Sequence, residues 1–349
     1  MAEIISHIYQ DKTGHWVIQS NENHSAGVAK LASQFAGEFG MSEWGKVLGL
    51  LHDKGKETDT FQQYIKKESG YDPDIKICGK HHHAYVGGIL AQKYYGKPSC
   101  NFFVNQIVSH HTGLHDSDEI KGIINQEIPS EVNIYHIKEK LNRPELNVQA
   151  NDFHHLARML FSCLVDADFL DTEAFMDKES SALRQNKDTL NDLLPLLENK
   201  LKDLKAKADC SEVNIIRNQI QQQCIEMADT RTGFYSLTVP TGGGKTLSSL
   251  VWAIKHAIKN GQKRVIIAIP YTSIIVQTAS VLRSIFGEEN VLEHHSCVAP
   301  EQIKDEKLKE KMKLATENWG YPIIVTTNVQ LFESMFSNKP SAFAENFTI

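Results

Sequence analysis

A chain of 349 residues, of which 41% are hydrophobic, is long enough for two domains with cores of their own. Its net charge of −6 lacks the basic excess usual in proteins that bind nucleic acid without sequence preference, so such binding would need a local groove, a bound metal or a partner. No apolar run approaches the roughly 18 residues of a membrane span and the first residues form no signal sequence, which predicts a cytoplasmic protein without membrane contact.

Cysteine and histidine are distributed differently along the chain. The six cysteines form no C-x-x-C pair, which argues against a zinc ribbon and against a disulfide framework. Histidines are concentrated, because 13 of the 16 lie at or before His155. That concentration indicates a local site built from imidazoles.

Residues 1–20 are weakly patterned, as in a short strand or a turn, and we assign no chemistry to them. A helix follows in which His24 shares a face with Val28 and Phe35, because these residues recur at helical spacing. Alone, such a histidine is more often a core residue bonded to a backbone carbonyl. The other histidines of this region favour a ligand instead.

The next predicted helix spans residues 42–53 and ends in His52-Asp53, before a stop at Gly55. Histidine and aspartate are both metal ligands, and neighbours at a helix end reach one site from two sides. Lys56 follows the stop. It is either a solvated lysine or an ammonium beside a substrate phosphate, and the sequence favours neither.

Two further predicted helices carry histidines at one end. His81-His82-His83 open a helix that contains Gly87-Gly88, and neighbours on a helix point about 100° apart, so at most one or two of the three face inward. The other helix spans residues 100–111 and ends in His110-His111.

A long helix over residues 151–169 places a carboxylate on its buried face. Asp168 is in register with Leu160 and Leu164, whereas Asp166 falls on another side. A buried carboxylate implies a cation, which makes Asp168 the better candidate ligand. Residues 177–210 are rich in Lys, Glu, Asp and Leu and read as an exposed helical connector.

A different chemistry begins after the connector. A strand over 234–239 runs into a glycine loop with Lys-Thr and then a helix over 247–259. Backbone N–H groups and the helix N-terminus cradle phosphates in such a loop, the lysine reaches the β- and γ-phosphates and the threonine binds Mg²⁺. The Pro-Thr-Gly-x-Gly-Lys-Thr form is typical of superfamily 2 helicases. The predicted nucleotide-binding residues are Thr241, Gly242, Gly243, Gly244, Lys245 and Thr246.

Continuous apolar runs at 264–269 and 321–327 predict buried strands of a parallel sheet. The sequence ends before the acidic motif and the second motor domain that such an ATPase requires. We therefore expect neither ATP hydrolysis nor unwinding from these residues, which read as an excised fragment or a natural short form.

Together these residues resemble the CRISPR-associated HD nuclease–helicase of type I interference, the Cas-three family, over nearly the whole chain. The order of the motifs carries the resemblance. They are His24, Leu-His52-Asp53-x-Gly-Lys56, His83-x-x-x-Gly-Gly88, Ser-His110-His111-Thr-Gly, Ser-x-Leu-Val-Asp166-Ala-Asp168, Leu-Thr-Val-Pro-Thr-Gly-Gly-Gly-Lys-Thr246, Ile-Pro-Tyr-Thr-Ser273 and Val-Thr-Thr-Asn-Val329.

The resemblance implies an all-α HD-fold metal-dependent phosphohydrolase domain over 1–185, a helical linker over 186–213 and a partial α/β RecA-like superfamily 2 helicase domain over 214–349. It also implies an activity, the degradation of single-stranded DNA, and a partner, an RNA-guided Cascade-like surveillance complex. The implied metal ligands are His24, His52, Asp53, His83, His110, His111 and Asp168, with His82 and Asp166 as alternatives to His83 and Asp168.

Imidazoles and carboxylates without thiolates favour Mn²⁺, Fe²⁺, Co²⁺, Ni²⁺ or Zn²⁺ over Mg²⁺ alone, as one ion or two. Asp53 is the candidate bridge between two ions and Lys56 the candidate that offsets phosphate charge. A complete helicase domain would also take ATP with Mg²⁺. Two rival hypotheses are an HD-type nucleotide phosphohydrolase and a non-enzymatic, nucleotide-responsive adaptor.

Overall fold

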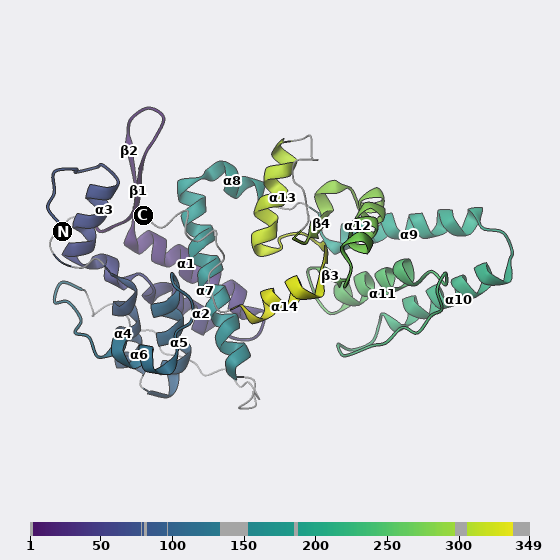
Figure 1. Cartoon of the computed structure of the whole chain (residues 1–349), viewed down its shortest axis with the longest axis horizontal. Helices are drawn as coiled ribbons and strands as arrows, with labels where there is room; N and C mark the ends of the chain where they lie inside the picture. The colour runs from purple at the N-terminus through teal and green to yellow at the C-terminus, as the bar shows by residue number, and fades with distance from the viewer. Residues whose placement is uncertain are drawn as a thin grey trace. The chain divides into compact units, whose positions relative to one another are not determined.

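The computed structural model describes residues 3–77, 79, 82–95, 97–132, 153–184, 188–296 and 306–337 (Figure 1). Two compact units make up the chain: an N-terminal unit of Met1–Ala182 with Phe336–Ile349, and a C-terminal unit of Leu183–Met335. His81, from the predicted run of three histidines, lies outside the described residues. A search of the described helices finds none with the length and apolar character needed to cross a membrane.

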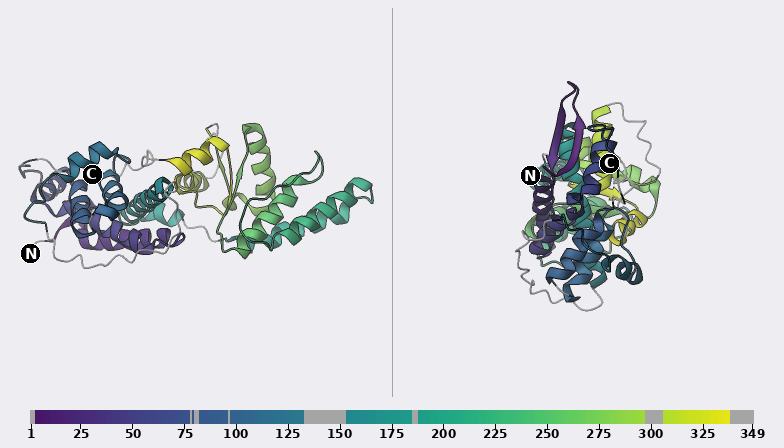
Figure 2. Two further views of the ribbon diagram at one scale, coloured as in Figure 1. Left: turned by 90° about the horizontal axis from the view of Figure 1, so that it is seen from below. Right: turned by 90° about the vertical axis from the view of Figure 1, so that its left-hand side faces the viewer.

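The N-terminal unit is helical and opens with an antiparallel β-hairpin. The hairpin joins β1 (Ile5–Gln10) to β2 (Trp16–Ser20) and projects from the unit, as the purple ribbon in the right-hand view of Figure 2 shows. The described helices that follow are α1 (Asn21–Gly37), α2 (Ser42–Leu51), η1 (Lys54–Glu57), α3 (Asp59–Glu68), α4 (Ala84–Tyr95), α5 (Lys97–Ser109), α6 (Ser117–Ile124), α7 (Phe153–Met176) and α8 (Lys178–Leu183).

Helix α1 starts at a sequence-encoded cap and packs closely on α2. Its N-cap Ser20 accepts a hydrogen bond from the backbone N–H of Asn23, which satisfies a donor that the first turn leaves free. The contact with α2 is made through small residues, because a Cβ added at Gly49 would lie 2.4 Å from Cα of Ala29. The two helix backbones therefore approach more closely than larger side chains would permit.

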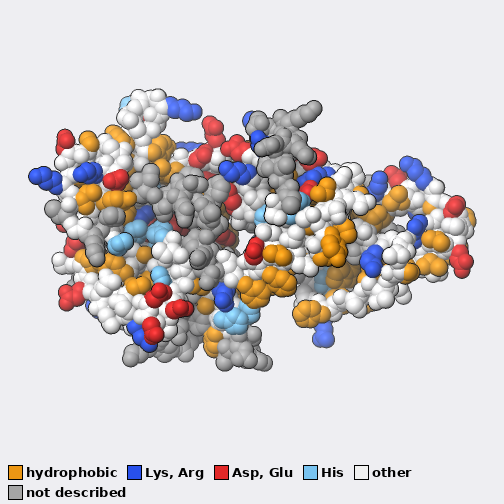
Figure 3. Space-filling model, in the orientation of Figure 1, with side chains coloured by type: hydrophobic (Ala, Val, Ile, Leu, Met, Phe, Trp, Pro, Cys, Tyr) orange, Lys and Arg blue, Asp and Glu red, His pale blue; other side chains and the backbone are white. Residues whose placement is uncertain are grey.

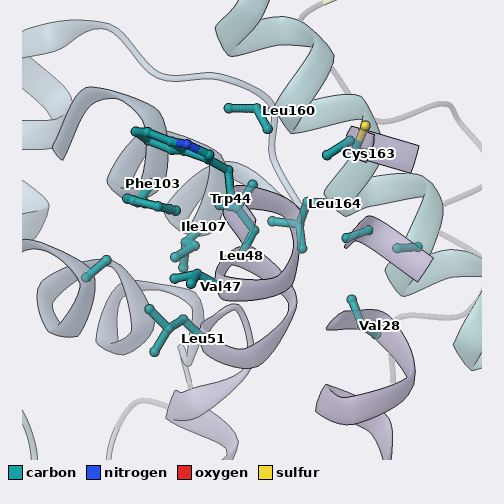
Figure 4. Packing of buried hydrophobic residues seen from close by; sticks show 14 of the residues in the cluster. Val28, Trp44, Val47, Leu48, Leu51, Phe103, Ile107, Leu160, Cys163 and Leu164 are labelled. Atoms are coloured by element: carbon teal, nitrogen blue, oxygen red, sulfur yellow. The ribbon is translucent and has the colours of Figure 1, made fainter. Parts of the chain in front are cut away.

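The core of this unit is formed where α1, α2, α4, α5 and α7 meet (Figure 4). The ring of Trp44 stacks on that of Phe103, with 4.7 Å between the ring centroids and an interplanar angle of 13°. Leu48, Leu51 and Leu164 are fully buried beside them, as the periodicity predicts. Burial of this kind stabilises each large side chain by about 1.5–3 kcal/mol.

The predicted helices of this unit are present with shifted ends. Residues 42–53, 100–111 and 151–169 correspond to α2, α5 and α7. His82 and His83 lie before α4 and not in its first turn, because α4 begins at Ala84. Helix α7 continues to Met176, seven residues beyond the predicted end, and this extension brings an additional carboxylate to the site described below.

The C-terminal unit is an α/β unit with a parallel sheet. Its strand order is β3-β5-β4, and Ile323 of β5 is in register with Val265 of β3 and Val291 of β4. The described elements are α9 (Leu190–Lys207), α10 (Glu212–Met227), α11 (Lys245–Lys259), β3 (Val265–Ala268), α12 (Thr272–Phe286), η3 (Glu288–Asn290), β4 (Val291–His294), α13 (Glu306–Asn318), β5 (Ile323–Thr326) and α14 (Asn328–Phe336).

The predicted parallel strands at 264–269 and 321–327 are confirmed as β3 and β5. Strand β5 lies between its neighbours and is buried throughout, whereas β3 is at the edge, where Ile266 is 39% exposed. An edge strand lacks a neighbour on one side, so the expectation of full burial holds only for β5. A helical domain followed by an α/β domain with a parallel sheet agrees with the predicted fold class.

Two local predictions for this unit are wrong. The exposed connector is in part a core element, because Leu190, Leu193, Leu197 and Leu201 of α9 are buried against α11 and α12. Their spacing of three to four residues forms an apolar face, which the many charged residues of the segment conceal. The predicted strand over 234–239 pairs with no described strand, and residues 234–238 are exposed. A β-strand needs such a partner for its backbone groups.

The close contact between α1 and α2 predicts the effect of adding one methyl group. We expect Gly49→Ala to destabilise the protein by about 1–3 kcal/mol, because overpacking against the Ala29 backbone outweighs the gain in helix propensity. Gly122→Ala in α6, where a Cβ meets nothing within 4 Å, is the matched control and should be neutral or stabilising. Scanning calorimetry of both variants measures the difference, and an unchanged transition in Gly49→Ala would contradict the packing argument.

Candidate metal centre

Five helices bring the seven predicted ligands together in the N-terminal unit. His24 lies on α1, His52 and Asp53 at the end of α2, and Asp168 on α7. His83 directly precedes α4, and His110 and His111 directly follow α5. Their ligand atoms form two groups, and within each group all the ligand atoms lie within 4.8 Å of one another. One group contains His24, His52, Asp53 and Asp168. The other contains Asp53, His83, His110 and His111, so Asp53 belongs to both.

The first group, which we call the two-carboxylate group, is arranged around imidazole nitrogens of α1 and α2. Nε2 of His24 lies 3.3 Å from Oδ2 of Asp53 and 3.1 Å from Oδ1 of Asp168. Nε2 of His52 lies 3.3 Å and 3.5 Å from the same two oxygens. The two nitrogens are 3.3 Å apart.

The second group, which we call the three-histidine group, uses the other oxygen of Asp53. Oδ1 of Asp53 lies 3.3 Å from Nε2 of His83 and 3.4 Å from Nε2 of His110. Nε2 of His83 is 2.9 Å from Nε2 of His111. One carboxylate thus presents a separate oxygen to each group.

Six of the eight separations given above, between 3.1 and 3.4 Å, are those expected of atoms that share a divalent cation. Two atoms that each bind one ion at about 2.1 Å, at angles of about 90–110°, are about 3.0–3.4 Å apart. Charge-assisted hydrogen bonds are shorter, at about 2.7–2.9 Å. Oδ1 of Asp53 and Nε2 of His110 are buried without a hydrogen-bond partner among the described residues. Both ligand groups could therefore hold a metal ion.

Two of the imidazole ligands use their other ring nitrogen, Nδ1, for a hydrogen bond to a backbone carbonyl. Nδ1 of His52 lies 2.8 Å from the carbonyl oxygen of Gly49, and Nδ1 of His110 lies 2.5 Å from that of Ile107. A carbonyl only accepts hydrogen bonds, so each Nδ1 carries a proton, and Nε2 is the nitrogen left to bind a metal. Both imidazoles are thus oriented as metal ligands.

The charges of the two-carboxylate group are strongly coupled. Burial disfavours imidazolium, but hydrogen bonds with Asp168, Asp171 and Asp53 outweigh it and raise the pKa of His24 to about 9. Burial is likewise outweighed by Asp53 and Asp168 at His52, whose pKa rises to about 10. Without a metal these histidines hold protons, and metal binding must displace those protons.

The pKa values of His83 and His111, in the three-histidine group, shift in the opposite direction. Burial lowers the pKa of His83 and holds that of His111 well below the usual value, so both imidazoles are neutral and ready to bind a metal. Burial opposes charge on Asp53 too, yet His52 and Lys56 hold its pKa well below the ordinary range. The three-histidine group therefore combines the anionic Asp53 carboxylate with the neutral imidazoles of His83 and His111.

Lys56 is buried, 5% exposed, and is not the solvated lysine of one sequence interpretation. Its Nζ lies 2.8 Å from Oδ2 of Asp53, and it also contacts Oγ of Ser6 at 3.2 Å and Nε2 of His7 at 3.3 Å. The ammonium thus compensates the Asp53 carboxylate directly.

The structure distinguishes His83 from His82 and Asp168 from Asp166, which the sequence left as alternatives. His83 belongs to the three-histidine group, whereas His82 is exposed and belongs to neither group. Asp168 belongs to the two-carboxylate group and Asp166 to neither. Side chains of His83 and Asp168 are 16% and 17% exposed, so solvent reaches a member of each ligand group. Figure 3 shows histidine side chains, in pale blue, on the surface of this unit.

Three residues around the cluster were not expected from the sequence. His7 of β1, to whose segment we assigned no chemistry, contacts the ring of His24 with 4.6 Å between centroids. Asp171 on α7 lies 2.8 Å from Nδ1 of His24, and Gln19 of β2 contacts both His7 and Asp171. The spacing Asp168-x-x-Asp171 on one helix face was the available signal for Asp171.

The predicted phosphate loop precedes α11 in the C-terminal unit. Gly242 and Gly244 have φ of 83° and 77°, a backbone conformation that other residues rarely adopt. Arg217 of α10 donates a hydrogen bond of 2.7 Å from Nε to the carbonyl of Gly242. Lys245 begins α11, and Thr241, Gly242, Gly244, Lys245 and Thr246 are exposed while Gly243 is buried. The N-terminus of α11 is thus open to an anion.

Comparison with known families matches both units. The family described as HD domain matches residues 21–149, and the family described as DEAD/DEAH box helicase matches residues 218–348. Asp168 and Asp171 lie beyond the matched HD region. No curated protein matches the chain.

Solved structures share the fold at low sequence identity. The crystal structure of T. fusca Cas3 is 16% identical, with a TM-score of 0.58, over 95% of this chain and 43% of that chain. The structures of T. fusca Cas3 with ATP and with ADP have TM-scores of 0.54 and 0.52, identities of 17% and 16%, and cover 92% and 90% of this chain and 43% and 42% of theirs. The chain therefore spans less than half the length of the structures it matches.

The raised pKa values of His24 and His52 predict how the metal-free protein responds to pH. Their contribution to stability is complete below the ordinary pKa of 6.5 and is lost as the pH rises through about 9 and about 10. We expect the melting temperature in chelator to fall by several degrees between about pH 7 and about pH 9, because the folded protein holds protons on His24 and His52 that the unfolded chain has released, so each rise in pH favours unfolding. His24→Gln, which cannot take up this proton, should show a shallower fall. Equal slopes for the two proteins would contradict the charge assignment.

Proposed function

We propose that this chain, a Cas3-like HD–helicase in its domain content and fold, is a metal-dependent nuclease that hydrolyses the phosphodiester bonds of single-stranded DNA. The observation that carries the proposal is Asp53, which presents one oxygen to each of two four-ligand groups. Phosphodiester hydrolysis at two adjacent ions is an established use of such an arrangement. The metal is a divalent transition metal, because the donors are imidazoles and carboxylates.

Each of the two ligand groups would hold one metal ion. When bound, a divalent metal would supply an activated water at neutral pH and stabilise charge on the phosphate. His24, His52 and Asp168 would hold one ion, and His83, His110 and His111 the other. Asp53 keeps the two groups adjacent, because its two oxygens are fixed to one carbon.

The contacts of Lys56 support a role other than the phosphate contact expected from sequence. Its ammonium is directed at Asp53, Ser6 and His7, and its side chain is buried. The ammonium forms an ion pair with one carboxylate and donates hydrogen bonds to two further groups. We infer that Lys56 holds the Asp53 carboxylate in place and does not itself bind substrate.

The helicase-type unit on the same chain favours a polymer substrate. Helicase-type motors act on nucleic acid, so a hydrolytic centre on the same chain is supplied with a strand rather than a free nucleotide. On the face shown in Figure 3, the described Lys and Arg side chains (blue) are interspersed with Asp and Glu (red). A net charge of −6 makes a partner useful for recruitment, and we propose an RNA-guided, Cascade-like surveillance complex in the cytoplasm.

The phosphate loop is proposed to bind ATP with Mg²⁺. T. fusca Cas3 has been solved with ATP and with ADP, and Lys245 and Thr246 begin a helix whose N-terminus is exposed. Backbone N–H groups there would contact phosphate oxygens, and Lys245 would add a positive charge.

Asp53→Asn tests the nuclease proposal. Asparagine keeps the shape of the side chain and an acceptor for Lys56, so the fold should survive while both ligand groups lose their shared charge. We expect metal affinity and cleavage of circular single-stranded DNA with Mn²⁺ or Ni²⁺ to fall by more than about 100-fold, beyond the loss typical of outer-shell partners. Asp118→Asn, with a side chain 94% exposed in the same unit, is the control.

The same assay separates the rival functions. Phosphate release from free nucleotides in preference to chain cutting would favour a nucleotide phosphohydrolase. Purified protein that takes up no metal under any condition would favour an adaptor. Cleavage that persists in chelator would overturn the metal-dependent mechanism.

Lys245→Ala tests the phosphate loop separately. We expect affinity for ATP to fall at least about tenfold, equivalent to about 1.4 kcal/mol, because a charge at the phosphate site is lost. Metal-dependent cutting without ATP should not change, since the ligand cluster lies in the other unit. Lys259→Ala, at the opposite end of the same helix and paired with Asp229, is the matched control, and calorimetry with ATP measures both.

A further inference from the structure

Asp171 contacts the cluster without belonging to either ligand group. Its Oδ2 lies 2.8 Å from Nδ1 of His24, on the side of the ring opposite the ligand atom Nε2. His24 is fully buried and the Asp171 side chain is 17% exposed. Because Asp168 and Asp171 are one turn apart on α7, the helix presents one carboxylate to each nitrogen of the same imidazole.

The N-terminal hairpin orients the Asp171 carboxylate. Gln19 of β2 donates a hydrogen bond of 2.8 Å from Nε2 to Oδ2 of Asp171. Its Oε1 lies 2.8 Å from Nδ1 of His7, which is therefore the protonated nitrogen of that ring. Nε2 of His7 is left to accept from Lys56, at 3.3 Å. A directed set of hydrogen bonds thus connects Lys56 to Asp171.

A glycine makes room for this carboxylate. A Cβ added at Gly27 would lie 1.9 Å from Oδ1 and 2.7 Å from Cγ of Asp171. Gly27 follows His24 by three residues on α1 and therefore shares its face. Helix α1 thus provides both the ring and the space for the group that orients it.

We propose that Asp171 is a positioning residue of the metal centre. Held by Gln19 in the space left by Gly27, it fixes His24 with Nδ1–H donating to Oδ2 and with Nε2 directed at Asp53 and Asp168. A carboxylate behind a ligating histidine sets the ring orientation and raises the basicity of the nitrogen that binds the metal. This inference rests on the proposed metal-dependent function.

The test is metal binding by the full chain in the absence of DNA. Co²⁺ is titrated into metal-free wild type and Asp171→Asn, and binding is followed by calorimetry and by the visible absorption of the bound ion. We expect Asp171→Asn to weaken at least one binding constant by about 10- to 100-fold and to change the absorption band. Asp166→Asn, on the same helix but in neither ligand group, is the matched control and should bind as wild type does.

Two further variants keep the test valid if Asp171→Asn fails to fold. Gln19→Met removes the donor to Asp171, and Gly27→Ala displaces its carboxylate, so each should weaken Co²⁺ binding in the same direction. Wild-type affinity and an unchanged absorption band in folded Asp171→Asn, or in both other variants, would overturn the positioning role alone. Wild type that binds no Co²⁺ at all would overturn the proposed metal-dependent function together with this inference.

Discussion

The arrangement of the ligand cluster in the N-terminal unit depends on the buried carboxylate of Asp53. At 1% exposure a carboxylate is costly unless cationic or hydrogen-bonding groups surround it. Here the compensation comes from imidazoles at the ends of several helices and from the ammonium of Lys56. Because these groups are distant in sequence, one charge connects elements that hydrophobic packing alone would hold less specifically. The same concentration of donors is what a divalent cation requires.

The helices can bring these ligands together because their backbones approach one another closely at glycines. A Cβ at Gly49 would meet the backbone of α1, and one at Gly87 would lie 1.8 Å from the carbonyl oxygen of Leu51. At Gly55, directly after the His52-Asp53 pair, a Cβ would lie 2.1 Å from the carbonyl oxygen of His83. Larger residues at these positions would separate α1, α2 and α4 and draw the imidazoles away from Asp53. The glycines of the motifs therefore have a packing role beside any role in turns.

The two units present binding groups in different ways. The ligand cluster depends on charged side chains buried by a helical core, so its geometry is as rigid as the packing around it. The phosphate loop depends on backbone N–H groups at an exposed helix terminus, with Gly242 and Gly244 in the left-handed region. A loop of this kind is recognisable in a short stretch of sequence. The cluster is recognisable only from several motifs in a given order.

By itself the sequence determined helices α1, α2, α5, α7 and α11, strands β3 and β5 and the phosphate loop, because each is encoded within one segment by periodicity or residue type. The seven candidate ligands followed from the resemblance that several motifs in a given order carry. Only the tertiary structure shows that each oxygen of Asp53 faces a separate ligand group, and that His83 rather than His82 lies in one of these groups. It also revealed Asp171, Gln19 and His7 around His24, and the buried face of α9. These facts depend on which side chains meet across segments far apart in the chain. Local pattern restricts the face on which a residue lies, but the partner of a buried charge is set by the packing of the whole unit.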